Sequence, residues 1–159
     1  MKKQKGFSLI ELLIVVAIIL IIAAIAIPNL LRSRMAANEA SAVGSLRTIN
    51  TAEVTYATTY PSIGFAALAS LGGASATCAT STGATSAGAC LIDATLAAGT
   101  KSGYTFTATA TGAAPAVQYT ANGNPTVPGQ SGQRFFFTDQ SGVIRYNGTA
   151  AASASDAAL

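Results

Sequence analysis

The sequence predicts an α+β protein in which one long N-terminal helix packs against a small antiparallel β-sheet head. Two patterns predict this fold class. An apolar run followed by helical periodicity fills the first 59 residues, and short alternating runs separated by turn residues follow residue 101. With 159 residues, the chain has room for one compact domain and an appendage.

Residues 12–31 form an apolar stretch without a charged side chain. As a helix this stretch would extend about 30 Å, which matches the hydrocarbon core of a membrane. A secretory signal peptide is one alternative, but the run is long and no clean small-x-small cleavage site follows it. A plain membrane anchor is the stronger alternative.

Basic residues flank the apolar stretch on both sides. Lys2, Lys3 and Lys5 predict a cytoplasmic N-terminus, although Arg32 and Arg34 on the far side weaken the charge asymmetry. The other six basic residues, these two arginines included, match the six acids in number, and no basic patch with interleaved aromatics occurs. The net charge of +3 therefore does not indicate a nucleic-acid partner.

One carboxylate, Glu11, stands at the front of the apolar stretch. An acidic side chain costs about 2.5 to 3.5 kcal/mol at the centre of a membrane helix, and less near the end of the span. Neither a signal peptide nor a plain anchor accounts for this residue. Within the chain, the nearest feature that favours an anion is the amino end of the helix, because of the helix dipole.

Residues 5–28, KGFSLIELLIVVAIILIIAAIAIP, resemble the class III prepilin signal of type IV pilins and type II secretion pseudopilins. The shared features are a basic leader, a Gly-Phe junction, a glutamate five residues into the mature chain, an apolar helix and a proline. The resemblance implies that a prepilin peptidase cleaves after Gly6 and methylates the new terminus at Phe7. Residues 1–6 would be the leader, and residues 7–31 a transmembrane helix that later forms the filament core.

The resemblance also implies partners and locations. Glu11 would face the amine of Phe7 on a neighbouring copy, so that the acid gains its counter-charge only on assembly. The subunit would lie in the inner membrane with its head outside, meet the assembly platform there, and end in an extracellular pilus or a periplasmic pseudopilus. Pro28 removes the hydrogen bond to the Ala24 carbonyl and predicts a helix kink.

The predicted function is that of a structural pilus subunit. The chain contains no Trp and therefore lacks the Asp-Pro-Trp-Gly stretch of major pseudopilins, which favours a pilus over a type II secretion pseudopilus. A single-pass membrane-anchored binding protein is the remote alternative. An enzyme is disfavoured, because a chain with no His and only two Cys cannot build a Ser/His/Asp triad. No cofactor is predicted.

Residues 32–59 predict an amphipathic continuation of the helix into the head, ending before the Tyr60-Pro61 pair. One arc of the helical wheel collects the apolar side chains of Met35, Val43, Leu46, Ile49 and Val54. Three polar residues interrupt that arc: Glu39, Asn50 and Glu53. Two interpretations of them stay open, which are contact with other subunits and a position at the solvent edge of the stripe.

The predicted head covers residues 60–159. Residues 60–100 are rich in small side chains and predict a surface loop with a short helix near residues 65–71. Cys78 and Cys90 lie in this loop. Since the resemblance puts the head in an oxidising compartment, they are expected to form a disulfide, with a free thiol pair as the alternative.

Residues 101–148 predict a three- or four-stranded antiparallel sheet that packs on the C-terminal half of the helix. Alternation marks residues 104–110 and the run from Val117, and two apolar runs flank a turn at residues 139–142. Residues 149–159 predict a flexible tail.

Two further patterns do not predict a site. Asp93, Asp139 and Asp156 are far apart in sequence, so no metal site is expected from them. The glycosylation sequon at residues 147–149 is short enough to occur by chance.

Overall fold

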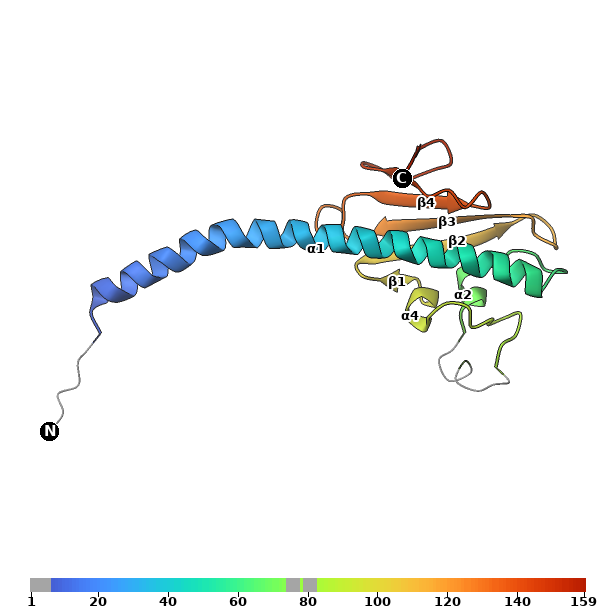
Figure 1. Ribbon diagram of the computed structural model, residues 1–159, viewed down its shortest axis with the longest axis horizontal. Coiled ribbons are helices and arrows are strands. Elements are labelled where there is room, and N and C mark those ends of the chain that lie inside the picture. Colours follow the sequence, from blue (N-terminus) through green and yellow to red (C-terminus); the bar gives the residue numbers. More distant parts are fainter. Residues whose placement is uncertain (1–6, 74–77, 79–82) are drawn as a thin grey trace. The chain divides into compact units, whose positions relative to one another are not determined.

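The computed structural model describes residues 7–73, 78 and 83–159 of the chain (Figure 1). Gly6 of the expected cleavage junction and the three N-terminal lysines lie outside the described residues. The expected start of the mature chain, Phe7, is the first residue that the structure describes.

The chain divides into two compact units, Met1–Arg34 and Met35–Leu159, and the helix α1 (Leu9–Thr59) runs through both. The helix ends immediately before Tyr60, as the sequence predicts, because Pro61 disfavours helical backbone in the residue that precedes it.

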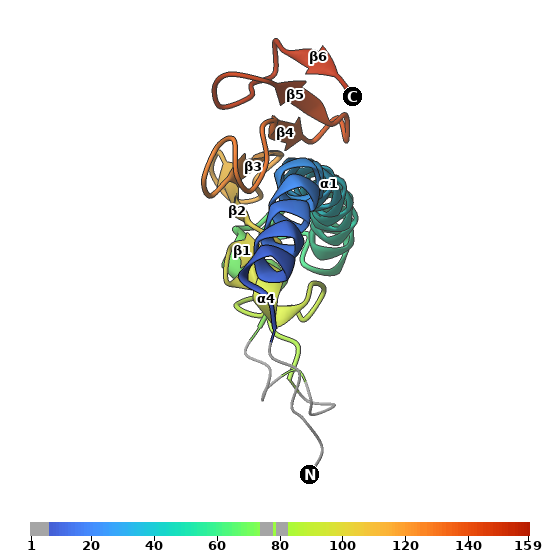
Figure 2. The ribbon, with the colours of Figure 1, turned by 90° about the vertical axis from the view of Figure 1, so that its left-hand side faces the viewer.

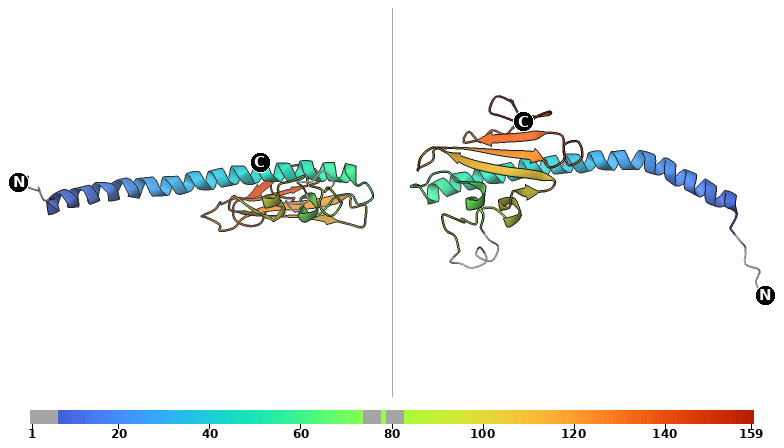
Figure 3. Two further views of the ribbon diagram at one scale, coloured as in Figure 1. Left: turned by 90° about the horizontal axis from the view of Figure 1, so that it is seen from below. Right: turned by 180° about the vertical axis from the view of Figure 1, so that it is seen from behind.

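The predicted α+β fold is confirmed in the unit Met35–Leu159, where α1 lies across one face of an antiparallel sheet (Figures 2 and 3). The six strands follow one another in chain order, so that each strand pairs with the next. They are β1 (Thr100–Lys101), β2 (Tyr104–Thr111), β3 (Gln118–Pro125), β4 (Phe135–Asp139), β5 (Arg145–Asn147) and β6 (Ala157–Ala158).

The sheet has two strands more than the upper limit that the sequence predicted. The strands β1, β5 and β6 are two or three residues long, which is too short for a period-two pattern to be visible in the sequence. The predicted turn at residues 139–142 is confirmed. It leads from β4 towards β5, with the Gly142 amide donating to the Asp139 carbonyl oxygen at 2.9 Å. Gly142 has a φ of 73°, which glycine adopts at little cost.

The C-terminal segment, which the sequence predicted as a flexible tail, is instead tied to the sheet. β6 pairs with β5, and the Asn122 side chain donates to the carbonyl oxygen of the buried Ala152 at 3.3 Å. The Asp156 carboxylate accepts hydrogen bonds from the Ser153 amide at 2.7 Å and from the Asn147 side chain at 3.0 Å. These polar contacts hold a segment whose small side chains give no apolar signal in the sequence.

The hydrophobic core lies between α1 and the sheet. Leu46 and Ile49 of α1 are fully buried there. They form one cluster with large side chains of the sheet, namely Tyr104, Phe106, Tyr119 and Phe136. The predicted apolar stripe is wrong at one position, because Val54 is 59% exposed.

The described part of the segment between α1 and the sheet includes the short helices α2 (Leu68–Leu71) and α4 (Ala94–Ala97). α2 confirms the short helix expected near residues 65–71. α4 was not predicted, since a four-residue helix of small side chains has no periodicity to read. Its first turn is capped by Asp93, which accepts a hydrogen bond from the Leu96 amide at 3.0 Å.

Candidate functional site

The amino end of α1 holds the residues that the sequence singled out for processing and assembly. Ser8 directly precedes the helix, and Glu11 lies in its first turn. The Ser8 amide donates to Oε2 of Glu11 at 3.0 Å. This contact is half of a Ser-x-x-Glu capping box, in which the acid satisfies an amide that the helix itself leaves unpaired. Phe7, beside it, is 77% exposed.

Within the residues that the structure describes, Glu11 forms no ion pair, because the two salt bridges join Asp93 to Lys101 and Glu39 to Arg134. Its nearest polar partner is therefore the start of its own helix. This agrees with the expectation that the amino end of the helix favours an anion there.

The first half of α1 exposes apolar side chains on all sides. The large hydrophobic residues between Leu9 and Leu31 are each about half exposed or more. α1 is the one helix in the described part of the chain that is long and apolar enough to cross a membrane, judged by length and composition alone. In water, so large an exposed apolar surface is unfavourable, so it marks a surface that another apolar phase covers.

α1 continues without interruption through Pro28. The kink predicted at this residue stays a prediction. Beyond it, Arg32 and Arg34 end the apolar stretch and are both exposed.

In the unit Met35–Leu159, Glu39 joins α1 to the residues just before β4. Its Oε1 accepts hydrogen bonds from the backbone amides of Gln133 at 2.8 Å and Arg134 at 3.2 Å. Its Oε2 accepts one from Nε of Arg134 at 2.8 Å. The guanidinium of Arg134 also lies over the rings of Phe136 and Tyr146, at 5.5 and 5.6 Å. The carboxylate is therefore both paired and hydrogen-bonded.

Asn50 makes a second polar contact between α1 and the sheet. Its Nδ2 donates to Oγ1 of Thr138 at 3.0 Å and to the Gly142 carbonyl oxygen at 3.3 Å. Its Oδ1 accepts a hydrogen bond from the Tyr119 hydroxyl at 2.9 Å. One amide thus links the helix to β3, to β4 and to the turn that follows β4.

Glu53 is the third polar residue on this face, and it is fully buried. Its Oε2 accepts a hydrogen bond from the Ala66 amide at 3.0 Å, while its Oε1 has no partner among the described residues. The interpretation of these residues as lying at the solvent edge is therefore wrong for Glu39 and Glu53, which are buried, while Asn50 is half-buried. All three side chains form hydrogen bonds within the head of their own chain.

The two buried glutamates have opposite shifts in pKa. Burial raises the pKa of Glu39, but the hydrogen bonds from Gln133 and Arg134 and the charge of Arg134 outweigh it and hold the pKa below its ordinary value. Burial raises the pKa of Glu53 to about 7, and only the hydrogen bond from Ala66 opposes the rise. The difference follows from the number of donors, since Glu39 has two backbone amides and the Arg134 guanidinium as partners, whereas Glu53 has one amide among the described residues.

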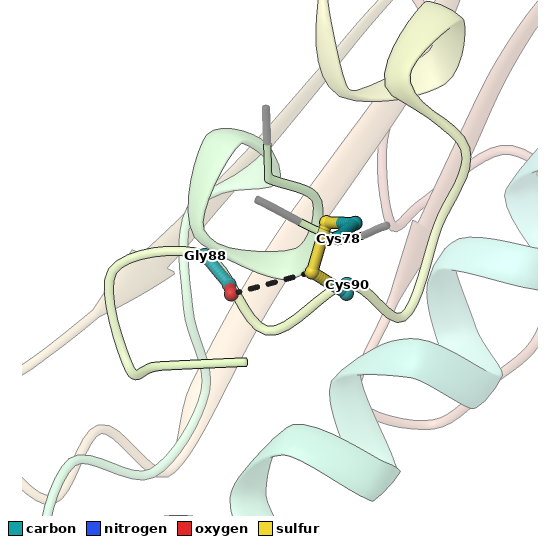
Figure 4. Close-up of a disulfide and its surroundings, with 3 residues drawn as sticks. All are labelled: Cys78, Gly88 and Cys90. Carbon is teal, nitrogen blue, oxygen red and sulfur yellow. Dashed lines mark hydrogen bonds between the residues drawn. A yellow bond between two sulfur atoms is a disulfide. The ribbon is translucent and has the colours of Figure 1, made fainter. Parts of the chain in front are cut away.

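Cys78 and Cys90 form the predicted disulfide, with their Cα atoms 5.6 Å apart (Figure 4). The Sγ atom of Cys90 lies 3.7 Å from the carbonyl oxygen of Gly88. Gly73 lies against the bond so closely that a Cβ there would be 2.6 Å from Sγ of Cys78. Glycine is therefore required at this position by close approach.

The residues of the sites that the sequence discounted have local roles in the structure. No cluster of three or more metal-ligating side chains occurs among residues 7–73, 78 and 83–159. Asp93, Asp139 and Asp156 each serve a separate turn or cap. In the sequon, Oδ1 of Asn147 accepts a hydrogen bond from the Thr149 amide at 2.9 Å, so the side chain is engaged locally.

Sequence reasoning missed the partner of Glu39 and the hydrogen-bond network of Asn50. The available signal was their place on the apolar arc of the helix, since a polar side chain on a buried face needs a partner. The identity of those partners was not visible, because they lie 69 to 95 residues further along the chain.

A helix that exposes an apolar first half and carries a head on its second half defines a membrane-anchored or self-associating subunit. Residues 1–27 match the prokaryotic N-terminal methylation motif. Over 39 residues the chain is 64% identical to the type IV wide pilus major component PilA4 of Thermus thermophilus. Over 54 residues it is 44% identical to the type IV major pilin protein PilA of Myxococcus xanthus. The N-terminal segment of the chain is therefore similar to that of type IV pilins, as the sequence predicts.

These matches are partial. They cover 24% and 34% of this chain, and 30% and 24% of the Thermus and Myxococcus proteins, so the chain matches less than a third of either relative's own length. No solved structure matches the chain significantly. The likeness is thus a property of the N-terminal segment.

The disulfide leads to a first prediction. Replacing both Cys78 and Cys90 by Ser should lower the free energy of unfolding of the head by about 3 kcal/mol, because the unfolded chain regains the freedom of a short closed loop. Chemical denaturation of the two proteins measures the difference. Thiol labelling without reductant is the companion test, and two labelled cysteines in the unreduced wild-type protein would show that the bond is absent.

The Glu39–Arg134 pair leads to a second prediction. Glu39→Gln keeps the size but removes the charge, and should cost about 2 kcal/mol of stability at pH 7. The folded-state pKa of Glu39 is lowered, so the wild-type advantage is present above the unfolded value of 4.5 and is lost as pH falls through the folded value. Denaturation at pH 7 and pH 3 measures this.

Arg134→Gln is the matched control for this pair. In a double-mutant cycle, the two substitutions together should cost less than their sum, because each removes the same interaction. A cost of Glu39→Gln that is equal at pH 7 and pH 3, or that adds fully to that of Arg134→Gln, would contradict the ion-pair account.

Proposed function

We propose that this chain is a structural, non-enzymatic subunit that polymerises into a type IV pilus after its leader is removed. The observation that carries the proposal is the first half of α1, an exposed apolar helix that begins with a methylation motif. Such a surface needs an apolar surrounding, first the membrane and then the same helix of neighbouring copies. The two relatives named above are pilus components.

In this proposal the subunit lies in the inner membrane before assembly, with its N-terminus in the cytoplasm and its head outside. Lys2, Lys3 and Lys5 support the orientation. Residues 1–6 are the leader, residues 7–31 span the membrane and later pack in the filament core, and the head begins after the helix. The membrane-embedded assembly platform takes the subunit from the bilayer into the filament.

We propose that Glu11 sets the position of one copy relative to its neighbour during assembly. In the single chain its carboxylate has the Ser8 amide as a partner but no cation in the described residues. The methylated amine of Phe7 on a neighbouring copy would supply one. A carboxylate in an apolar surrounding is strongly disfavoured without a counter-charge and tolerated with one, so correct packing of copies is favoured over incorrect packing.

A pseudopilin of a type II secretion system is the alternative function. It would share the processing, the membrane helix and the pairing of Glu11. It differs in the product, because a pseudopilus stays in the periplasm, whereas a pilus extends from the cell. Filaments sheared from the surface of cells at native expression distinguish the two, and their absence would favour the pseudopilin.

Processing gives the third prediction. The mature chain should begin at Phe7 and carry one methyl group on its amine, which mass spectrometry of the purified protein measures. Gly6→Val should retain residues 1–6, because a branched side chain obstructs the approach of the peptidase to the backbone. An N-terminus beyond Pro28 would indicate an ordinary signal peptide, and a wild-type chain that keeps its leader would indicate an ordinary anchor.

The fourth prediction concerns assembly. Because Glu11 also belongs to the capping box, the substitution is chosen to remove its charge while keeping its hydrogen bond. Glu11→Gln retains a side-chain oxygen that accepts from the Ser8 amide but removes the negative charge. Membrane insertion should persist, because an uncharged amide is cheaper to bury. Filament yield should fall at least tenfold, because the amine of Phe7 would then lack its counter-charge.

Two variants separate the roles of Glu11. Glu11→Ala removes the charge and the cap together, so a loss of filaments shared by Gln and Ala is due to charge, whereas a loss confined to Ala is due to capping. The measurement compares sheared filaments with membrane-held protein in the same cells at equal expression. Normal filament yield from Glu11→Gln would refute the pairing.

A further inference from the structure

Glu53 is the most isolated charge-bearing group in the described part of the head. Its side chain is fully buried, and among the described residues no cation lies within ion-pairing distance of it. One hydrogen bond reaches it, from the Ala66 amide to Oε2, and Oε1 has none. Glu39, on the same helix, differs in every respect, with two backbone amides and the guanidinium of Arg134 as partners.

The two tyrosines beside Glu53 cannot complete its hydrogen bonding, because each hydroxyl is used elsewhere. The Tyr56 hydroxyl donates to the Ser86 carbonyl oxygen at 2.6 Å, and the Tyr119 hydroxyl donates to Oδ1 of Asn50 at 2.9 Å. Both tyrosines are themselves almost fully buried. The environment of Glu53 is therefore low in polarity and offers a single donor.

The Ala66 amide belongs to residues 60–66, the segment that leaves α1 and crosses the end of the head. The Phe65 amide donates to the Ala116 carbonyl oxygen at 3.0 Å, and the Ala116 amide donates to that of Ile63 at 2.8 Å. The ring of Phe65 lies 4.8 Å from that of Tyr119. Glu53 is thus the side chain of α1 that holds the far end of this segment.

We propose that Glu53 is a proton-dependent latch on residues 60–66. As the neutral acid, it fits the apolar site and keeps the segment docked through the Ala66 amide. Ionisation places an unpaired charge in that site, and the strain is relieved when the segment opens and water reaches the carboxylate.

Two buried tyrosines are the titratable groups beside Glu53. Burial raises the pKa of Tyr56, and it raises that of Tyr119 to about 12, so both stay neutral. The ring of Tyr60 packs against that of Tyr56 at 4.8 Å, and the Asp139 carboxylate accepts hydrogen bonds from the amide and hydroxyl of Ser141. Burial raises the pKa of Glu53 itself to about 7, so that its proton leaves between mildly acidic and mildly alkaline pH.

The direction of the effect follows from linkage. A folded-state pKa of about 7, above the ordinary value of 4.5, means that the docked segment is favoured below 4.5 and progressively disfavoured as pH rises through 7. If the open segment gives Glu53 an ordinary pKa, the equilibrium between docked and open forms shifts on the order of a hundredfold from pH 5 to pH 8. This inference concerns the head alone and stands whether or not the chain assembles into a filament.

Hydrogen exchange of the full chain in detergent micelles tests the latch. After correction for the intrinsic pH dependence of exchange, protection of the Ala66 and Phe65 amides should fall on the order of a hundredfold between pH 5 and pH 8. Glu53→Gln should remove this dependence, since it cannot ionise. Glu39→Gln is the matched control on the same helix and should keep it. Protection that is independent of pH in the wild type, or that falls equally in Glu53→Gln, would overturn the proposal.

If the Glu53→Gln protein fails to fold, a second measurement on the wild-type chain tests the proposal. The side-chain carboxyl of Glu53 can be titrated by carbon NMR in the wild-type chain. A carboxyl midpoint near 7, with Ala66 protection that falls from about pH 4.5 and levels off above that midpoint, supports the latch, and a midpoint near 4.5 rejects it.

Discussion

The arrangement of helix and sheet in the head depends on the hydrogen bonds that the buried polar side chains of α1 form with the rest of the head. A polar side chain taken out of water without a hydrogen bond costs about 1 to 3 kcal/mol, more if it is charged. Glu39 and Asn50 meet this requirement by reaching residues that precede β4, β4 itself and the turn after it. Apolar packing alone tolerates small shifts between helix and sheet, whereas these directional contacts are satisfied in one arrangement.

The same helix meets two different surroundings along its length. Its first half exposes apolar side chains on every side, and its second half buries one face and leaves small or polar residues and Val54 on the other. The buried face of the second half packs on the sheet of its own chain. In the proposed filament, the first half obtains its partners from lipid and then from other copies, so one element links the fold of the subunit to its assembly.

The three glutamates of α1 illustrate how surroundings assign roles to one residue type. Glu11 caps the start of the helix through the Ser8 amide, and Glu39 forms an ion pair that is further held by backbone amides. Glu53 is fully buried with a single donor and no cation in the described structure, and burial raises its pKa to about 7. A carboxylate near a helix start, beside a guanidinium or in an apolar core thus acts as a cap, an anchor or a proton-sensitive group.

The sequence by itself determined the long helix, its end before Pro61, the fold class and the N-terminal motif, because each depends on neighbours within a few residues. It also predicted the turn at residues 139–142, where glycine adopts a conformation that other residues avoid. Only the tertiary structure decided that Glu39, Asn50 and Glu53 face the head and that Val54 does not. It also decided that the six strands of the sheet pair in chain order and that the C-terminal segment docks on the sheet. These features rest on contacts between residues far apart in the chain, and such contacts leave no periodic signal in the sequence.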